Sequence, residues 1–247
     1  MSTIHLGTSG WSYAHWVGPF YPAAVPRSQW LAYYASHLES VEINNTFYRL
    51  PSAETIASWH DATPTHFLFA VKASRFITHV KRLREPSQTL SPFLERVTHL
   101  QGKLGPILFQ LPPRFPSSPD RLAGFLRALP AGLAYAFEFR DRSWFNDRTY
   151  GLLAERNAAL CIYELNGQTP SLEATARFVY VRLHGPDGPY RGGYDEARLA
   201  HWAERCRAWT QEHRDVFLYF DNDEAGHAPR DALALAGLLA RDKAGVR

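Results

Sequence analysis

Six short apolar segments of the chain each end in a charged, amide or imidazole residue. They are 41–44, 67–72, 107–110, 136–140, 181–184 and 218–221. Side chains alternate between the two faces of a strand, so Glu138 shares a face with Arg140, and Arg182 with His184. Because an unpaired buried charge is very costly, such groups must contact one another or a ligand. The pattern predicts one polar site at the carboxyl ends of a parallel sheet.

Strand-like and helix-like segments alternate along the whole chain, which predicts a parallel α/β sheet with covered faces. We expect strands at 4–7, 40–44, 67–72, 105–110, 134–139, 159–163, 178–183 and 216–220. We expect helices at 27–37, 53–60, 92–100, 119–129, 147–156, 196–212 and 231–241, with Ser91-Pro92 and Ser118-Pro119 as two helix starts. Eight strands in 247 residues favour a (β/α)8 TIM-barrel-like fold. The chain should form one domain, 1–247, with a shortened or missing helix between strands six and seven.

The connections between these segments are unequal in length. The strand-to-helix loops 8–26, 73–91, 184–195 and 221–230 are long, whereas the helix-to-strand loops 101–104, 130–133, 157–158 and 213–215 are short. Barrel enzymes build their sites from the strand-to-helix loops. Loop length and polar strand ends therefore indicate the same face of the barrel.

Composition narrows the class of protein. Hydrophobic residues make up 45% of the chain, as in ordinary globular proteins, and the net charge of +3 is too small for a general nucleic-acid coat. Cys161 and Cys206 lack C-x-x-C spacing and are expected to be buried thiols. The chain begins without the features of a secretory leader, and no segment approaches the length of a membrane span. We therefore expect a cytoplasmic protein that does not contact membranes.

The carboxylates at the strand ends are candidates for acid–base chemistry. Glu138 and Glu42 are the leading catalytic candidates, with His184 to transfer a proton or orient a partner. Alternatively, nearby cations neutralise these carboxylates in a structural network. We expect no tightly held transition metal, because only one histidine lies at a strand end and the H-E-x-x-H and H-x-H spacings are absent. A weak magnesium site through Asp221, Asp223 and a bound phosphate is compatible with the sequence.

Basic and imidazole side chains crowd the loop after the third strand. They are Lys72, Arg75, His79, Lys81, Arg82 and Arg84. A solvated surface is the plain interpretation of such a run. Arg140 and Arg182 add further positive charge inside the barrel mouth, however. The combined charge indicates an anionic ligand such as a phosphate, nucleotide or acidic sugar. Asn44 and Gln110 end neighbouring strands and are expected to contact the same ligand.

Residues 185–194 form a glycine-rich segment after strand seven. A mobile lid over a phosphate site is one interpretation of this segment, and an irregular surface loop is the other. Trp11, Tyr190 and Tyr194 are the aromatic residues expected to contact the ligand, because they lie nearest the strand ends or this segment. The Gly7-Thr8-Ser9-Gly10 segment lacks the lysine and spacing of a P-loop, and Ser9 has no evident base partner.

Several motifs together resemble the DUF72 (YecE-like) family over essentially the whole chain. They are Gly7-Thr8-Ser9-Gly10-Trp11-Ser12-Tyr13, Glu42-Ile43-Asn44-Asn45-Thr46-Phe47-Tyr48-Arg49, Gly105-Pro106-Ile107-Leu108-Phe109-Gln110-Leu111-Pro112-Pro113, Glu138-Phe139-Arg140, Arg182-Leu183-His184-Gly185 and Tyr219-Phe220-Asp221-Asn222-Asp223. The resemblance implies a TIM-barrel-like fold akin to the endonuclease IV and sugar-isomerase group, but no known reaction. Asp221 and Asn222 of the last motif are expected ligand contacts, and Asp221 stands where the family is expected to have Asn.

Two functional hypotheses follow. The first is an uncharacterised barrel enzyme that acts on a small anionic sugar- or nucleotide-like substrate at the carboxyl-terminal face, by hydrolysis, isomerisation or lyase-type cleavage. The alternative is a protein that binds or processes nucleic acid, related to the endonuclease IV-like barrels. We expect no cofactor in either case, and the sequence indicates neither the substrate nor an oligomeric state.

Overall fold

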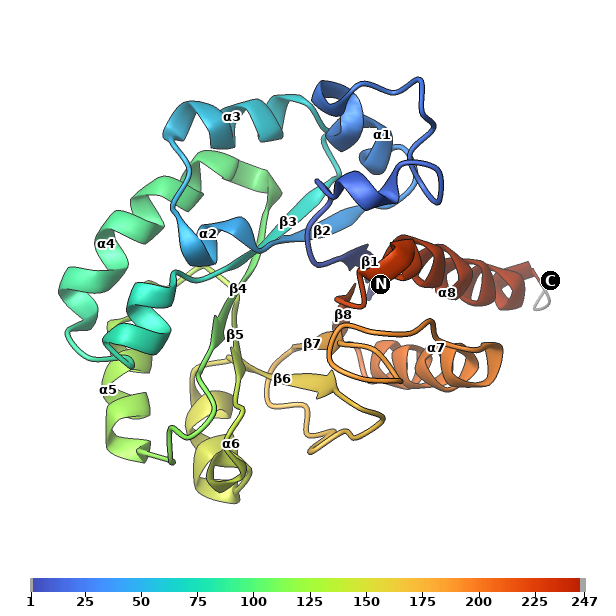
Figure 1. Cartoon of the computed structure of the whole chain (residues 1–247). Coiled ribbons are helices and arrows are strands. Elements are labelled where there is room, and N and C mark those ends of the chain that lie inside the picture. The colour runs from blue at the N-terminus through green and yellow to red at the C-terminus, as the bar shows by residue number, and fades with distance from the viewer. Residues whose placement is uncertain (1, 245–247) are drawn as a thin grey trace.

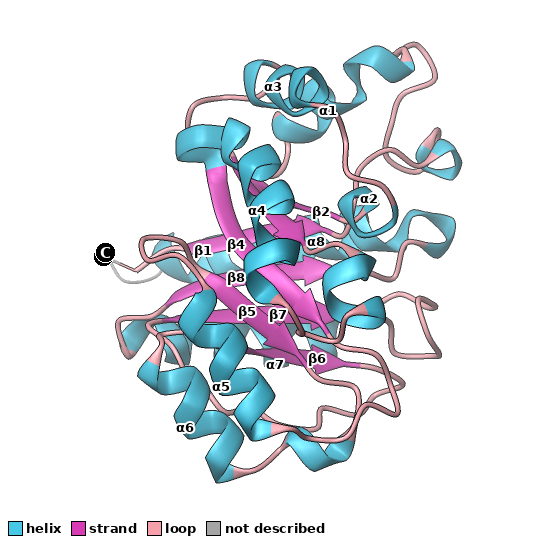
Figure 2. Cartoon of the chain, turned by 90° about the vertical axis from the view of Figure 1, so that its left-hand side faces the viewer, coloured by secondary structure: helices cyan, strands magenta, loops and turns pink. Residues whose placement is uncertain are grey.

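In the computed structural model, which describes residues 2–244, eight parallel strands form a nearly closed barrel surrounded by helices (Figure 1). The strands are β1 (Ile4–Thr8), β2 (Ser40–Ile43), β3 (Leu68–Lys72), β4 (Leu104–Gln110), β5 (Tyr135–Glu138), β6 (Ala159–Glu164), β7 (Phe178–Leu183) and β8 (Asp215–Phe220). They pair in the order β1-β8-β7-β6-β5-β4-β3-β2. Because the pairs are parallel, the carboxyl ends of the strands gather on one side, where the long loops lie (Figure 2). The barrel predicted from the sequence is confirmed.

Helices follow most of the strands. They are α1 (Trp30–Ala35), α2 (Asn45–Tyr48), α3 (Ala53–Asp61), α4 (Pro86–Val97), α5 (Pro119–Ala128), α6 (Asp147–Glu155), α7 (Glu196–Gln211) and α8 (His227–Ala244). Shorter helical turns are η1 (Ala14–Trp16), η2 (Arg27–Gln29), η3 (Phe76–Val80, a π-helix), η4 (Thr98–Lys103), η5 (Arg142–Trp144) and η6 (Glu224–Gly226). The stretch between β6 and β7 carries no helix, as the sequence predicts. No helix within residues 2–244 combines the length and apolar character needed to cross a bilayer.

One predicted helix start is wrong. The helix after β3 begins at Pro86, and Pro92 lies inside it. The buried face of α4 includes Leu90 as well as Phe93, so the helical repeat already runs before Pro92. Both prolines satisfy the rule for a first-turn proline, and packing selects the earlier one.

The barrel has two apolar layers, set by the alternation of side chains along each strand. Its interior is filled largely by small residues and by the rings of Phe178, Tyr180, Phe217 and Tyr219. The other face of each strand packs against the helices in a larger core. Cys161 lies in the interior and Cys206 in the outer core, and both are buried free thiols, as predicted. The same alternation points the polar side chains at the strand ends into the mouth of the barrel.

The seam between β1 and β2 closes through little backbone pairing. Its bridge joins Ser9 to Glu42, and the Gly10 N–H donates to the Glu42 carbonyl at 2.8 Å. Below this bridge, Gly7 lies so close to β2 that a Cβ atom there would stand 2.0 Å from the Ser40 carbonyl oxygen. The seam therefore requires glycine at position 7, and it places Ser9 beside Glu42.

Candidate functional site

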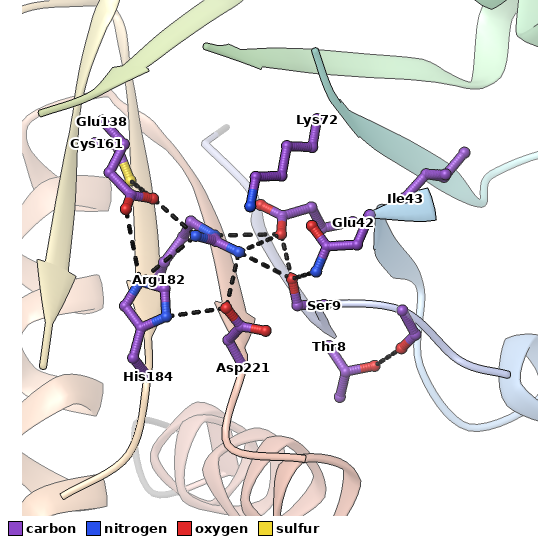
Figure 3. A network of polar contacts seen from close by, with 12 residues as sticks. Thr8, Ser9, Glu42, Ile43, Lys72, Glu138, Cys161, Arg182, His184 and Asp221 are labelled. Carbon is purple, nitrogen blue, oxygen red and sulfur yellow. Dashed lines mark hydrogen bonds and ion pairs between the residues drawn. The ribbon is translucent and has the colours of Figure 1, made fainter. Parts of the chain in front are cut away.

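The centre of the barrel mouth is Arg182, whose side chain is 1% exposed. Its guanidinium donates at 2.8 Å to each of three carboxylates, which come from β2, β5 and the end of β8 (Figure 3). These carboxylates belong to Glu42, Glu138 and Asp221. Burying so many charges is tolerable only because they satisfy one another. Arg182 thus acts as the cation on which three strand ends converge.

Glu138 is held ionised by two guanidiniums. Burial alone would raise the pKa of this carboxyl, but Arg140 and Arg182 hold it well below its usual range. Arg140 donates its Nε–H to Glu138, and its guanidinium lies 4.6 Å from the centre of the Tyr163 ring. Arg140 Nη1 has no hydrogen-bond partner within residues 2–244, so this donor is available to a ligand.

Ser9 joins the network through the barrel seam. Its hydroxyl donates to Glu42 and accepts hydrogen bonds from Asn44 Nδ2 at 2.6 Å and from Arg182 Nη2 at 3.1 Å. The other oxygen of Glu42 accepts from the Tyr180 hydroxyl at 2.7 Å. The sequence interpretation that Ser9 lacks a base partner is therefore wrong. Its position just after β1, a strand end like the others, was the signal that could have revealed it.

His184 lies between a carboxylate and two arginines. Its Nε2 atom is 2.8 Å from Arg140 Nη2 and 3.4 Å from Arg182 Nη1. Because a guanidinium only donates, Nε2 carries a lone pair and the ring is neutral. The proton is then on Nδ1, 2.9 Å from Asp221 Oδ2, a close contact that is too poorly aligned for a strong hydrogen bond. His184 can therefore accept a proton at Nε2 if Arg140 moves onto a ligand.

Lys72 points into the same space without an ion pair (Figure 3). Its ammonium lies 4.7 Å from the centre of the Phe47 ring, and within residues 2–244 it makes no ion pair or hydrogen bond through Nζ. Burial and the neighbouring Arg182 lower the pKa of Lys72, and Glu42 only partly offsets them. Lys72 is the first of the basic residues that follow the third strand, and its side chain points into the barrel mouth.

The basic loop, residues 72–84, forms one edge of the mouth. Burial, Arg75, Lys72 and Arg82 together lower the pKa of His79 to about 4. Lys81 is neutralised by Glu85 at 2.6 Å, but Arg75 and Arg82 make no ion pair within the described chain.

The backbone of this loop is unusual. It contains the π-helix η3, which is followed by left-handed conformations at Arg82, Leu83 and Glu85. π-Helices and non-glycine left-handed residues are uncommon and cluster at functional sites.

Within the described part of the chain, two of the predicted contact residues make no hydrogen bond or ion pair to the network through their side chains. Trp11 is buried edge-on against Trp59 at 5.2 Å, and Gln110 donates weakly to the adjacent Leu111 carbonyl at 3.4 Å. These two side chains are occupied by packing and by a local hydrogen bond.

Two further predicted contact residues anchor the glycine-rich loop. The Tyr194 hydroxyl accepts the Gly185 N–H at 3.2 Å, and Asn222 donates to the Gly192 carbonyl at 2.7 Å and to Asp231 at 2.8 Å. Tyr190 differs from them, because it is half exposed and lies edge-on to His184 at 5.6 Å. Of the predicted aromatic contacts, it alone borders the network.

Among the side chains that the structure describes, no group of three or more from His, Cys, Asp and Glu is arranged to hold a metal ion. The carboxylates that could have done so surround Arg182 instead.

Comparisons with known proteins agree on one family. A model of the family described as "Protein of unknown function DUF72" matches residues 5–246. The UPF0759 protein YunF of Bacillus subtilis (strain 168) is 28% identical over 98% of this chain and 97% of that protein. The UPF0759 protein YecE of Escherichia coli (strain K12) is 32% identical over 58% of this chain and 50% of that protein.

Solved structures give the same result. A DUF72 family protein of Thermotoga maritima superposes with a TM-score of 0.81 and 25% identity, covering 96% of this chain and 99% of that one. One of Enterococcus faecalis superposes with a TM-score of 0.82 and 22% identity, covering 96% of both chains, which shows the shared fold alone.

Proposed function

The chain belongs to the DUF72 family, and because that family is described as one of unknown function, we propose a function from the chain's own site. The protein is an enzyme that binds a small anionic, sugar- or nucleotide-like substrate at the carboxyl ends of the barrel strands. The observation that carries this proposal is the positive charge without ion pairs at one edge of the mouth. There Lys72 has no carboxylate within 4.0 Å among the described residues, and Arg75 and Arg82 act together with it on His79.

We assign a different role in the proposed function to each residue of the network. Arg182 uses its donors on carboxylates, so it organises Glu42 and Glu138 and does not reach for the substrate. Lys72 and the available Nη1 of Arg140 are the donors left for an anion. Proton transfer is assigned to His184, whose unprotonated Nε2 lies in the cluster, with the two glutamates as neighbouring carboxylates.

A thermal-shift screen with phosphosugars and nucleotides tests the proposal. A ligand present at about 100 times its dissociation constant stabilises the folded protein by about 2.7 kcal/mol. We expect at least one compound to raise the melting temperature of the wild type and of Lys81→Met, and to lose most of this effect in Lys72→Met. Each shift is measured against the same variant without ligand. If no compound acts, or if Lys72→Met responds like the wild type, the proposal is wrong.

Nucleic acid is the second candidate, and one observation favours it. Tyr48, at the end of α2, is 82% exposed, and Phe76, inside the basic loop, is 50% exposed. Exposed aromatic rings among arginines can stack on unpaired bases. If several phosphates are held, affinity for single-stranded DNA or RNA falls steeply with salt, and removing Arg82 and Arg84 flattens the slope. The absence of binding at low salt would dispose of this candidate.

A further inference from the structure

The lysines of this chain lie in different surroundings. The structure describes the side chains of Lys72, Lys81 and Lys103. Lys81 Nζ pairs with Glu85 at 2.6 Å, and Lys103 Nζ donates to the Thr63 carbonyl at 2.7 Å. Lys72 alone among the three has neither an acceptor nor a counter-ion. Its amine and Arg140 Nη1 are donors in the mouth that the network leaves without a partner, and of the two only the amine can become a nucleophile.

Burial and the Arg182 guanidinium lower the pKa of Lys72, although Glu42, Glu138 and Asp221 oppose them. The amine is largely buried at the end of β3 and points toward Glu42 and the cluster around Arg182 (Figure 3). It lies 4.7 Å from the centre of the Phe47 ring. Desolvation and a neighbouring cation are the two means by which proteins make a lysine amine nucleophilic. The side chain is nevertheless partly exposed, so a small molecule in the mouth can reach it.

We propose that Lys72 is a nucleophile that forms an imine with an aldehyde or ketone group of the substrate. This inference rests on the proposed function and names its substrate class: a small carbonyl compound that carries a phosphate or carboxylate. The amine lone pair attacks the carbonyl carbon, and the oxygen takes up a proton to give a carbinolamine. Loss of one water molecule then forms the C=N bond, and one proton from solvent remains on the nitrogen as the iminium. We assign the anionic group to Arg140, whose Nη1 has no partner among the described residues, and to Arg75 and Arg82, which act on His79 together with Lys72.

Reductive trapping tests the inference. The wild type is incubated with glyceraldehyde 3-phosphate or with uncharged glyceraldehyde, in the presence of cyanoborohydride at mildly alkaline pH. Hydride reduces the imine to a stable secondary amine, and peptide mass spectrometry locates the adduct. We expect Lys72 to be modified about tenfold or more faster than Lys81, the internal reference with ordinary surroundings. The phosphorylated aldehyde should react faster at Lys72 than glyceraldehyde, but not at Lys81.

Two matched variants and the pair of aldehydes distinguish imine formation at Lys72 from binding of the anionic group. Lys72→Arg should lose the adduct and keep the stabilisation by phosphosugars, because the positive charge remains, whereas Lys81→Arg should keep both. If Lys72 reacts no faster than Lys81 while phosphosugars still stabilise the protein, the imine is wrong and the proposed function stands. If both aldehydes react equally fast at Lys72, the reactive amine stands and the anion site beside it is wrong. The comparison of Lys72 with Lys81 is made in the wild-type protein, so it does not depend on whether a variant folds.

Discussion

The imidazole of His184 is clamped between Arg140, 2.8 Å from its Nε2 atom, and Asp221, 2.9 Å from its Nδ1 atom. The arginine can only donate, so the ring is the neutral tautomer with its proton on Nδ1. Which nitrogen carries the proton is therefore set by Arg140, which follows β5, while the ring itself follows β7. A histidine fixed in this way is ready to accept a proton at one defined atom.

Asp221→Asn should weaken this clamp. The amide keeps the shape of the carboxylate but loses its charge, which both Arg182 and His184 contact. We expect a loss of about 1–3 kcal/mol in the free energy of unfolding, measured by urea denaturation. Asp120→Asn is the control, since that side chain is 95% exposed, and it should change little. Equal stability of the two variants would show that Asp221 is not part of a coupled network.

Removing the central cation should be far more damaging. Arg182→Met leaves three carboxylates buried without their shared donor, and we expect a loss of about 3–5 kcal/mol or failure to fold. Arg148→Met removes an ion pair of similar length, 3.0 Å to Asp120, from the surface. It should cost at most about 1 kcal/mol. A mild effect of Arg182→Met on urea denaturation would contradict the central place given to Arg182.

The barrel seam can be tested at a glycine. In Gly7→Ala the new Cβ would meet the Ser40 carbonyl oxygen at 2.0 Å, so β1 and β2 must separate. We expect destabilisation of about 1–3 kcal/mol or more, together with loss of the Ser9–Glu42 contact. Gly151→Ala places a methyl group on an exposed position of α6 with nothing within 4 Å and should be neutral or slightly stabilising. Similar thermal stability of the two variants would mean that the seam has room.

The network also predicts acid sensitivity. The folded protein holds the pKa of Glu138 well below its ordinary value of 4.5, so this carboxyl stabilises the fold above that pH. As the pH falls below this value, the unfolded chain takes up the proton first and stability is lost. The free energy of unfolding should drop more steeply below pH 4.5 in the wild type than in Glu138→Gln. Parallel pH profiles for the two proteins would refute an ionised, paired Glu138.

Much of the mouth could be predicted from the sequence because strand alternation is a simple periodicity. It places Glu42, Glu138, Arg182 and Asp221 on the inner face of one barrel, and they do meet. The alternation pattern could not show which acceptors the guanidinium N–H groups of Arg182 would bind. Arg182 looked like a ligand contact, but the carboxylates occupy it, because a buried guanidinium must satisfy its charge locally.

Two features of the site could not be predicted from the sequence: the contacts between distant segments and the directions of the loop side chains. Ser9 meets Glu42 across 33 residues only because the barrel closes there. Trp11 and Tyr194 lie near strand ends, yet their rings turn into packing against Trp59 and Phe220. Loop side chains follow no period, so nearness in sequence to a strand end does not fix their direction.

The most direct test of the proposed anion site is the pKa of His79, measured by NMR titration and assigned with His79→Gln. Burial, Arg75, Lys72 and Arg82 lower this pKa to about 4, so the ring senses the charge at the edge of the mouth. An anion bound among these cations offsets them and must favour the protonated imidazole. We predict a pKa near 4 for His79 in the free protein and a clearly higher value when a stabilising phosphosugar saturates the protein. A saturating ligand that leaves the pKa of His79 unchanged would contradict the proposed anion site, because the anion would then bind elsewhere.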